Sequence, residues 1–177
     1  MTASLPTSES AIIIPVELPV AVRRLRDGLD WSAKLGVPPH VTLLYPFMPS
    51  DALTDDVRRR IATIVADEPS FSFTLAQMKR WPTVVWLAPE PDEPFRRLTA
   101  ALSAEFPDYP PYGGAHDEVI PHVTIVEDPR PDWLAAAERA LPAMLPIRDV
   151  AREAVIMAAD ATGRWSTVWQ LPLGRRT

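Results

Sequence analysis

The sequence contains no cysteine among its 177 residues. This absence excludes a disulfide framework, a zinc site with cysteine ligands and a thiol nucleophile. A chain of this length buries about 70% of its unfolded surface, so a hydrophobic core can stabilise it without crosslinks. The length predicts a single domain spanning residues 1–177.

Lysine is scarce as well. The chain has 2 lysines and 16 arginines against 23 acidic residues, and its formal net charge is −5. Long nucleic acids are bound through many phosphate contacts to basic side chains, so an acidic chain is a poor candidate for that role. We therefore expect no binding of long nucleic acid, whereas a small anionic ligand in a local pocket stays compatible with the composition.

Long apolar stretches are missing too. The apolar run at residues 11–16 is short and is broken by Pro15, and the residues before it carry no basic segment of the kind found in signal peptides. No stretch approaches the ~20 apolar residues that a transmembrane helix needs. We expect a soluble cytoplasmic protein that does not bind membranes.

Histidine is rare, and its distribution is the main signal in the chain. Two of the three histidines lie in a Pro-His-Val-Thr tetrapeptide that occurs at residues 39–42 and again at 121–124. In a strand, side chains at i and i+2 share a face, and Val and Thr favour strands. Proline is tolerated at the first residue of a strand. Each copy therefore predicts a strand with an imidazole and a hydroxyl side by side: His40 with Thr42, and His122 with Thr124.

Hydrophobic periodicity suggests that the tetrapeptide recurs because the chain is duplicated. Residues 11–79 predict the order strand, helix, motif strand, helix, strand, and residues 83–158 predict the same order, with one more strand at 164–171. The helix expected from residue 20 has Arg26 outside its apolar stripe. Pseudo-repeats at about 11–79 and 83–171 would form two lobes that bring the motifs together.

Two imidazoles facing one site suit an in-line displacement at phosphorus. Their ordinary pKa near 6.5 allows opposite protonation states at neutral pH. The neutral ring can take a proton from the attacking water, and the protonated ring can give one to the leaving oxygen. Hydroxyl groups of Thr42 and Thr124 can bind the non-bridging phosphate oxygens. This scheme requires no metal and no cofactor, and we expect neither.

The arrangement resembles the 2H phosphoesterase superfamily, the bacterial 2′-5′ RNA ligase and RNA 2′,3′-cyclic phosphodiesterase group. The two His-x-Thr motifs carry the resemblance, and similar segments lie at residues 39–47, 80–82, 110–114 and 169–173. The resemblance implies a bilobal α+β fold in which two mostly antiparallel sheets face a central cleft, with helices outside. It also implies that His40 and His122 act as acid and base and that Thr42 and Thr124 bind phosphate.

The implied activity is hydrolysis of 2′,3′-cyclic phosphate ends of RNA or of small cyclic nucleotide phosphodiesters. Two alternatives stay open: a 2′-5′ RNA ligase, which uses the reverse reaction at the same site, and a non-catalytic nucleotide-binding module on the same fold. The expected partner is a small cyclic phosphodiester or an RNA 3′ end, and we expect a monomer.

Other side chains are candidates for substrate contact. Aromatic rings at Tyr45 and Phe47 can stack on a base, although strict alternation places Tyr45 opposite His40, where it would pack in the core. Trp81 precedes a chain break at Pro82. The remaining two candidates are Tyr112, in a loop with two glycines, and Arg130, which follows the second motif.

The third histidine, His116, lies beside acidic residues in the loop before the second motif. A metal site formed by His116, Asp117 and His122 is one interpretation. No recognised ligand spacing supports it, and an exposed loop histidine is the simpler interpretation. We therefore predict no metal site.

Overall fold

A computed structural model of the chain describes residues 9–116 and 118–175. Its strands are β1 (Ser10–Pro15), β2 (His40–Leu44), β3 (Phe71–Trp81), β4 (Val84–Glu90), β5 (Val123–Glu127), β6 (Ile147–Ala151), β7 (Glu153–Ala159) and β8 (Trp165–Pro172). Its helices are α1 (Val20–Leu29), α2 (Trp31–Lys34), α3 (Asp55–Asp67), α4 (Glu93–Glu105) and α5 (Pro131–Ala140), and short 3-10 helices occur at Ser50–Ala52, Pro111–Gly114 and Leu141–Met144.

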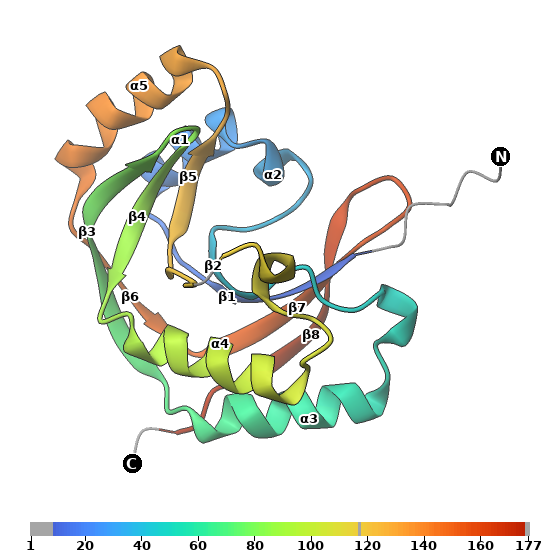
Figure 1. Cartoon of the computed structure of the whole chain (residues 1–177). Helices are drawn as coiled ribbons and strands as arrows, with labels where there is room; N and C mark the ends of the chain where they lie inside the picture. The colour runs from blue at the N-terminus through green and yellow to red at the C-terminus, as the bar shows by residue number, and fades with distance from the viewer. Residues whose placement is uncertain (1–8, 117, 176–177) are drawn as a thin grey trace, which may run out of the picture.

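All eight strands belong to one antiparallel sheet, in the order β6-β3-β4-β5-β2-β1-β7-β8. The sheet is curled, with α1 and α5 outside one half and α3 and α4 outside the other (Figure 1). The mixed helix and strand composition agrees with the expected fold class, but the expected pair of separate sheets is not found. The correction has a simple cause, because β2 and β5 pair at Val41 and Val123 and join the two halves.

The strand order is symmetric about the β5–β2 pair. In chain order, the repeat expected at about residues 11–79 contains β1-α1-β2-α3-β3, and the residues after it contain β4-α4-β5-α5 followed by β6 and β7. The third strands are exchanged, because β3 pairs with β4 and β7 pairs with β1. Each half of the sheet therefore contains a strand from the other repeat.

The last strand expected in residues 83–158 is divided at Arg152, between β6 and β7. Before it, β6 pairs with β3 at one end of the sheet, and after it, β7 pairs with β1 towards the other end. The sheet must curl until its two ends approach for one residue to make this connection. Gly174, which follows β8, links the two ends of the sheet by backbone hydrogen bonds with Glu68 and Ser70, which precede β3. A Cβ atom at this position would clash with the Ala66 carbonyl oxygen.

The outer helices form where the sequence combines caps with an apolar stripe. The Thr54 hydroxyl accepts a hydrogen bond from the Val57 amide at the start of α3, and two aspartates occupy the first turn. The buried stripes of α3 and α4 pack on the convex face of the sheet within one core; these residues are Val57, Ile61, Val65, Phe95, Leu98 and Leu102. None of the helices in residues 9–116 and 118–175 is both long and apolar enough to cross a membrane.

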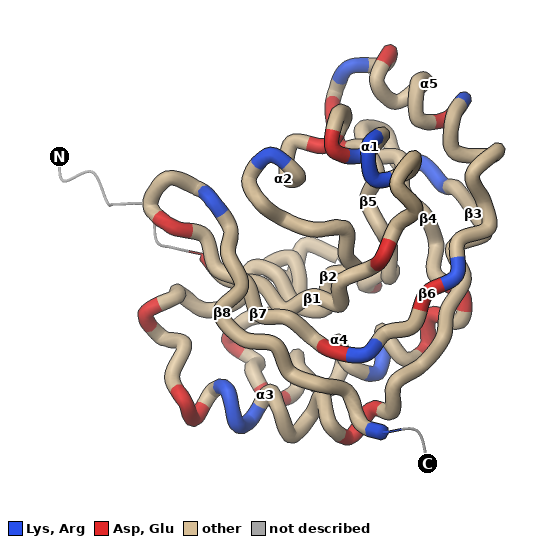
Figure 2. Tube along the Cα trace, turned by 180° about the vertical axis from the view of Figure 1, so that it is seen from behind, with Lys and Arg blue, Asp and Glu red and all other residues tan. Residues whose placement is uncertain are grey.

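Positive charge is absent from the middle of the sheet. Strands β1, β2, β4, β5, β7 and β8 contain no Lys or Arg. Within the sheet these residues occur only in β3 and β6, and the others lie on helices and loops (Figure 2). The concave face at β2 and β5 therefore carries no permanent positive charge of its own.

A buried ion pair fixes the segment that leads into β2. Arg26, expected on the polar side of its helix, is 1% exposed and lies 2.9 Å from the equally buried Asp30. The Arg26 guanidinium also donates to the Val37 carbonyl and to the Ser32 hydroxyl, each at 3.1 Å. The expectation was wrong because Asp30 and the turn after α1 supply partners that periodicity cannot show.

Replacing Asp30 with Asn should lower the free energy of unfolding by about 3 kcal/mol, because the buried Arg26 charge would lose its counterion. Urea denaturation followed by circular dichroism measures the change. The exposed i,i+3 pair Arg59–Asp56 offers a matched control, and Asp56→Asn should cost less than about 0.5 kcal/mol. Equal losses in the two variants would contradict the structural role of the buried pair.

Candidate active site

The two His-x-Thr motifs lie side by side in the centre of the sheet. The pairing of Val41 with Val123 is antiparallel, and both valines are fully buried in the core. Because neighbouring residues in a strand point to opposite faces, the motif histidines and threonines on either side of these valines point into the concave face. The four side chains line one cavity: His40, Thr42, His122 and Thr124.

A bulge follows the threonine in each motif strand. In β2 the register skips Leu43, and in β5 it skips Ile125, so two consecutive residues after each threonine face the core. Leu43, Leu44, Ile125 and Val126 are accordingly all buried. The next residue in each copy returns to the cavity, and these residues are Tyr45 and Glu127.

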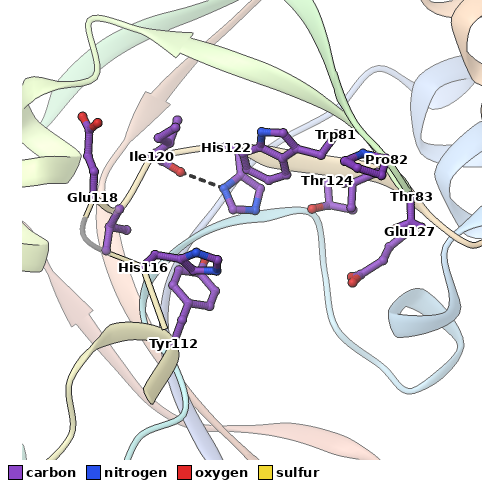
Figure 3. Close-up of a pocket in the computed structure, with 12 residues that line it drawn as sticks. Trp81, Pro82, Thr83, Tyr112, His116, Glu118, Ile120, His122, Thr124 and Glu127 are labelled. Carbon is purple, nitrogen blue, oxygen red and sulfur yellow. Dashed lines mark hydrogen bonds between the residues drawn. The ribbon is translucent and has the colours of Figure 1, made fainter. Parts of the chain in front are cut away.

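The two imidazole rings are held in the same way. Nδ1 of His40 lies 2.7 Å from the Pro38 carbonyl oxygen, and Nδ1 of His122 lies 2.8 Å from the Ile120 carbonyl oxygen (Figure 3). A carbonyl oxygen can only accept, so Nδ1 carries the hydrogen in both rings. Nε2 of each ring is left as the nitrogen available to take or give a proton.

The charges around the two rings differ. Burial lowers the pKa of His40 to about 4, opposed by the bond to Pro38, and the positive charge of Arg26 lowers it further. Burial also lowers the pKa of His122, opposed by the bond to Ile120, without a contribution from Arg26. His40 is therefore the ring more strongly held in its neutral form.

Trp81, a predicted substrate contact, lies against the second histidine. Its ring centroid is 4.8 Å from that of His122, and it stacks at 4.6 Å on Trp86, whose centroid is 5.8 Å from the same imidazole. The two tryptophans therefore form the wall against which His122 packs edge-on, and no comparable pair lies against His40 among the described ring contacts.

Tyr112, also a predicted substrate contact, covers the motifs from the loop side. Its backbone lies in the left-handed region (φ 52°, ψ 31°), which is rare for a residue with a large side chain. Its amide donates to the Tyr45 carbonyl, which holds the loop against β2. Burial raises the pKa of Tyr112, and a hydrogen bond with the Thr42 hydroxyl opposes this shift. Strained backbone of this kind is common at binding sites.

Two cavities meet at the motifs. One, of about 320 Å³, lies on the His40 side, and the other, of about 610 Å³, lies on the His122 side between Trp81 and His116. They share four lining residues: Tyr112, His122, Thr124 and Glu127. In the larger cavity, Thr124 and Glu127 lie on one side of His122, and Tyr112 and His116 lie on the other (Figure 3). Together they form one cleft with the histidines at its centre.

The structure does not bring every predicted contact to this cleft. Phe47 is 4% exposed and packs edge-on against Phe106 in the core, so it cannot stack on a ligand. Arg130 pairs with Asp128 through two guanidinium nitrogens and lies 3.5 Å from the Trp133 ring centroid, outside both cavities. Tyr45 does line the cleft, contrary to strict alternation, because of the bulge before it.

Other lining residues were not predicted. Glu127 lies at the position of the second motif that corresponds to Tyr45 in the first, which the shared His-x-Thr spacing indicates once the bulge is known. Trp31 and Trp165 form a wall of the smaller cavity, and Trp31 is 54% exposed. No local pattern around either tryptophan distinguishes it from a core residue.

The proposed metal alternative is only partly within the described chain. His116 lies edge-on to Tyr112 at 5.7 Å between ring centroids, and Asp117 lies outside the described residues. Within residues 9–116 and 118–175, no group of three or more His, Asp or Glu side chains is arranged to hold a metal ion.

Comparison with known proteins points in the same direction as the geometry. A family model described as the 2'-5' RNA ligase superfamily matches residues 14–161. Among curated proteins, none matches the chain. Solved structures with a similar fold include TT0787 of Thermus thermophilus, with 18% identity, a TM-score of 0.61 and coverage of 96% of this chain and 100% of that one.

Two structures of E. coli LigT are similar as well. The apo form has 19% identity, a TM-score of 0.56 and coverage of 95% of this chain and 98% of that one. The complex with 3'-AMP has 18% identity, a TM-score of 0.52 and coverage of 96% and 99%. At this level of identity the likeness shows that the fold is shared over nearly the whole chain.

Histidine titration by NMR tests the electrostatics of the site. The His40 ring should titrate with a pKa of about 4, and His122 should titrate below 6.5, because burial penalises both imidazolium ions. Sulfate should raise both values, since an anion in the cleft stabilises the charged rings. A His40→Gln variant assigns the resonances, and a His40 pKa near 6.5 would contradict the buried environment.

Proposed function

Because the chain belongs to the 2′-5′ RNA ligase superfamily, we propose that it hydrolyses a cyclic phosphodiester, either a 2′,3′-cyclic phosphate end of RNA or a small cyclic nucleotide. The observation that carries the proposal is that both His-x-Thr motifs line one cavity. Membership of a superfamily of phosphoesterases and ligases supports an enzymatic reaction at phosphorus. The structure of E. coli LigT with 3'-AMP supports a small nucleotide as the ligand.

The asymmetry of the two rings supports a division of roles. His40 is neutral over the wider pH range and takes the proton of the attacking water at Nε2. His122, on which the charge of Arg26 does not act, is the ring better able to hold a proton and gives it to the leaving oxygen. After one turnover His40 carries the proton and His122 is neutral, and exchange with water restores the starting state.

The threonines and the loop complete the site. Thr42 and Thr124 lie on the same face as the imidazoles and donate hydroxyl hydrogen bonds to the non-bridging oxygens, where charge increases in the transition state. Tyr112 holds the Thr42 hydroxyl in place and covers the reacting centre. All of these groups come from one chain, so the proposed reaction needs no partner subunit, cofactor or metal ion.

The two other functions differ from this one in products or in turnover. A 2′-5′ RNA ligase would run the reaction in reverse at the same histidines, and analysis of products formed from RNA ends separates the two. A non-catalytic module would be stabilised by cyclic nucleotides without converting them. The presence of both complete motifs in one cavity favours an enzyme over a binding module.

Single replacement of His40 or His122 with Ala should lower the rate of 2′,3′-cyclic nucleotide hydrolysis by about 10²–10⁴-fold, because each ring supplies one proton transfer. The assay measures release of the 2′- or 3′-monophosphate by chromatography, with EDTA present to remove adventitious metal ions.

The third histidine provides the matched comparison. His116→Ala removes an imidazole from the outer part of the cleft but keeps both motifs, and its rate should stay within about fivefold of that of the wild type. A wild-type rate in either motif variant would overturn the two-histidine mechanism.

The pH dependence of kcat/KM follows from the two pKa shifts. The base must be neutral, so activity is lost as pH falls through the His40 pKa of about 4. The acid must be protonated, so activity is lost as pH rises through the His122 pKa, which lies below 6.5. The optimum should fall on the acidic side of neutrality, with kcat/KM decreasing about tenfold per pH unit above it. An optimum above pH 8 would contradict these assignments.

A further inference from the structure

The position that follows the bulge differs between the two motif strands. In β2 it is Tyr45, whose hydroxyl donates to the Glu9 carboxylate at 2.7 Å, and in β5 it is Glu127. The symmetry of the sheet thus places a carboxylate in one wall of the cleft where the other wall has a phenol. Glu127 lines both cavities at the point where they meet.

The Glu127 carboxylate has no counterion among the described residues. Within the part of the chain that the structure describes, no ion pair or hydrogen bond involves its side chain. Burial and the charge of Asp30 raise the pKa of Glu127, and its own charge raises the pKa of Tyr45 and of Tyr112. Its negative charge therefore acts on both Tyr45 and Tyr112 across the cleft.

The rest of the cleft does not cancel this charge. No Lys or Arg is among the described residues that line the two cavities, and the central strands contain none (Figure 2). Arg26 is close to His40, but its charge is paired with Asp30. Among the described lining groups, the cation that remains is one protonated imidazole.

A phosphodiester brings one negative charge into this site, whereas a ligand with a second phosphate brings two or more. We propose that Glu127 is a charge-selecting residue, which restricts the cleft to ligands whose only anionic group is the phosphodiester itself. This inference rests on the proposed function, and it favours a small cyclic phosphodiester over a 5′-phosphorylated nucleotide or an RNA end. Because Glu127 lines both cavities, its charge repels a second phosphate whichever cavity holds the nucleoside.

The test compares two substrates at neutral pH: adenosine 2′,3′-cyclic phosphate and the same compound with a 5′-phosphate. Wild-type kcat/KM should be about tenfold higher for the first, as expected for unit charges several ångströms apart in a partly buried site. Glu127→Gln keeps the shape of the side chain and should remove most of this preference. Using the ratio cancels any effect of the variant on folding or on the histidines, which both substrates share.

Glu118→Gln is the matched control. Glu118 lines the larger cavity and is exposed, as Glu127 is, but its carboxylate lies 2.9 Å from Arg96. Its charge is already compensated, so the preference should change by less than about twofold. Equal kcat/KM for the two substrates in the wild type, or an unchanged preference in Glu127→Gln, would overturn the inference.

Binding measurements separate this inference from the proposed function. If the wild type hydrolyses neither compound, the proposed function fails, and calorimetry with adenosine 3′-phosphate and adenosine 3′,5′-bisphosphate still tests the charge selection. The inference would be supported without turnover if the wild type bound the monophosphate more tightly than the bisphosphate and Glu127→Gln bound the two equally. Equal affinities in the wild type, or binding of neither nucleotide, would overturn it.

Discussion

The site depends on one point of strand pairing. Val41 and Val123 are the only registered pair between β2 and β5 in the described structure, and they join the two halves of the sheet. Their burial fixes which face each strand turns to the core, and therefore which face presents the histidines and threonines. Two motifs 82 positions apart in sequence come together because the residues between the imidazole and the hydroxyl in each motif pair with one another.

Much of this arrangement follows from the sequence. The repeated tetrapeptide predicts two strands with the same side chains on one face, and the repeated element order predicts a symmetric pair of halves. What strict alternation cannot show is the bulge after each threonine, which turns Tyr45 and Glu127 into the cleft. Arg26 was misplaced for a related reason, since only tertiary partners reveal that a charged helix residue is buried. The joined sheet likewise depends on a pairing between distant strands, which no local pattern encodes.

The electrostatics of the cleft combine desolvation with a lack of fixed cations. Burial holds both imidazoles toward their neutral forms, and the surrounding strands carry no basic side chain to attract a polyanion. In the proposed mechanism, phosphate meets only hydroxyl groups and a single transient imidazolium, which would attract anions modestly. Weak binding of the substrate in the ground state leaves more of the interaction energy to stabilise the transition state.

The exchange of third strands has a consequence for how the molecule is held together. A polypeptide ending after β3 would leave one edge of β1 and both edges of β3 without their partners, because β7, β4 and β6 all follow β3 in the chain. Neither repeat is then a self-sufficient folding unit, and a break in the backbone at the turn between β3 and β4 would leave two fragments that each complete the other's sheet. The symmetric strand order is in this sense that of an intramolecular dimer with swapped strands, and the two motifs flank its pseudo-dyad.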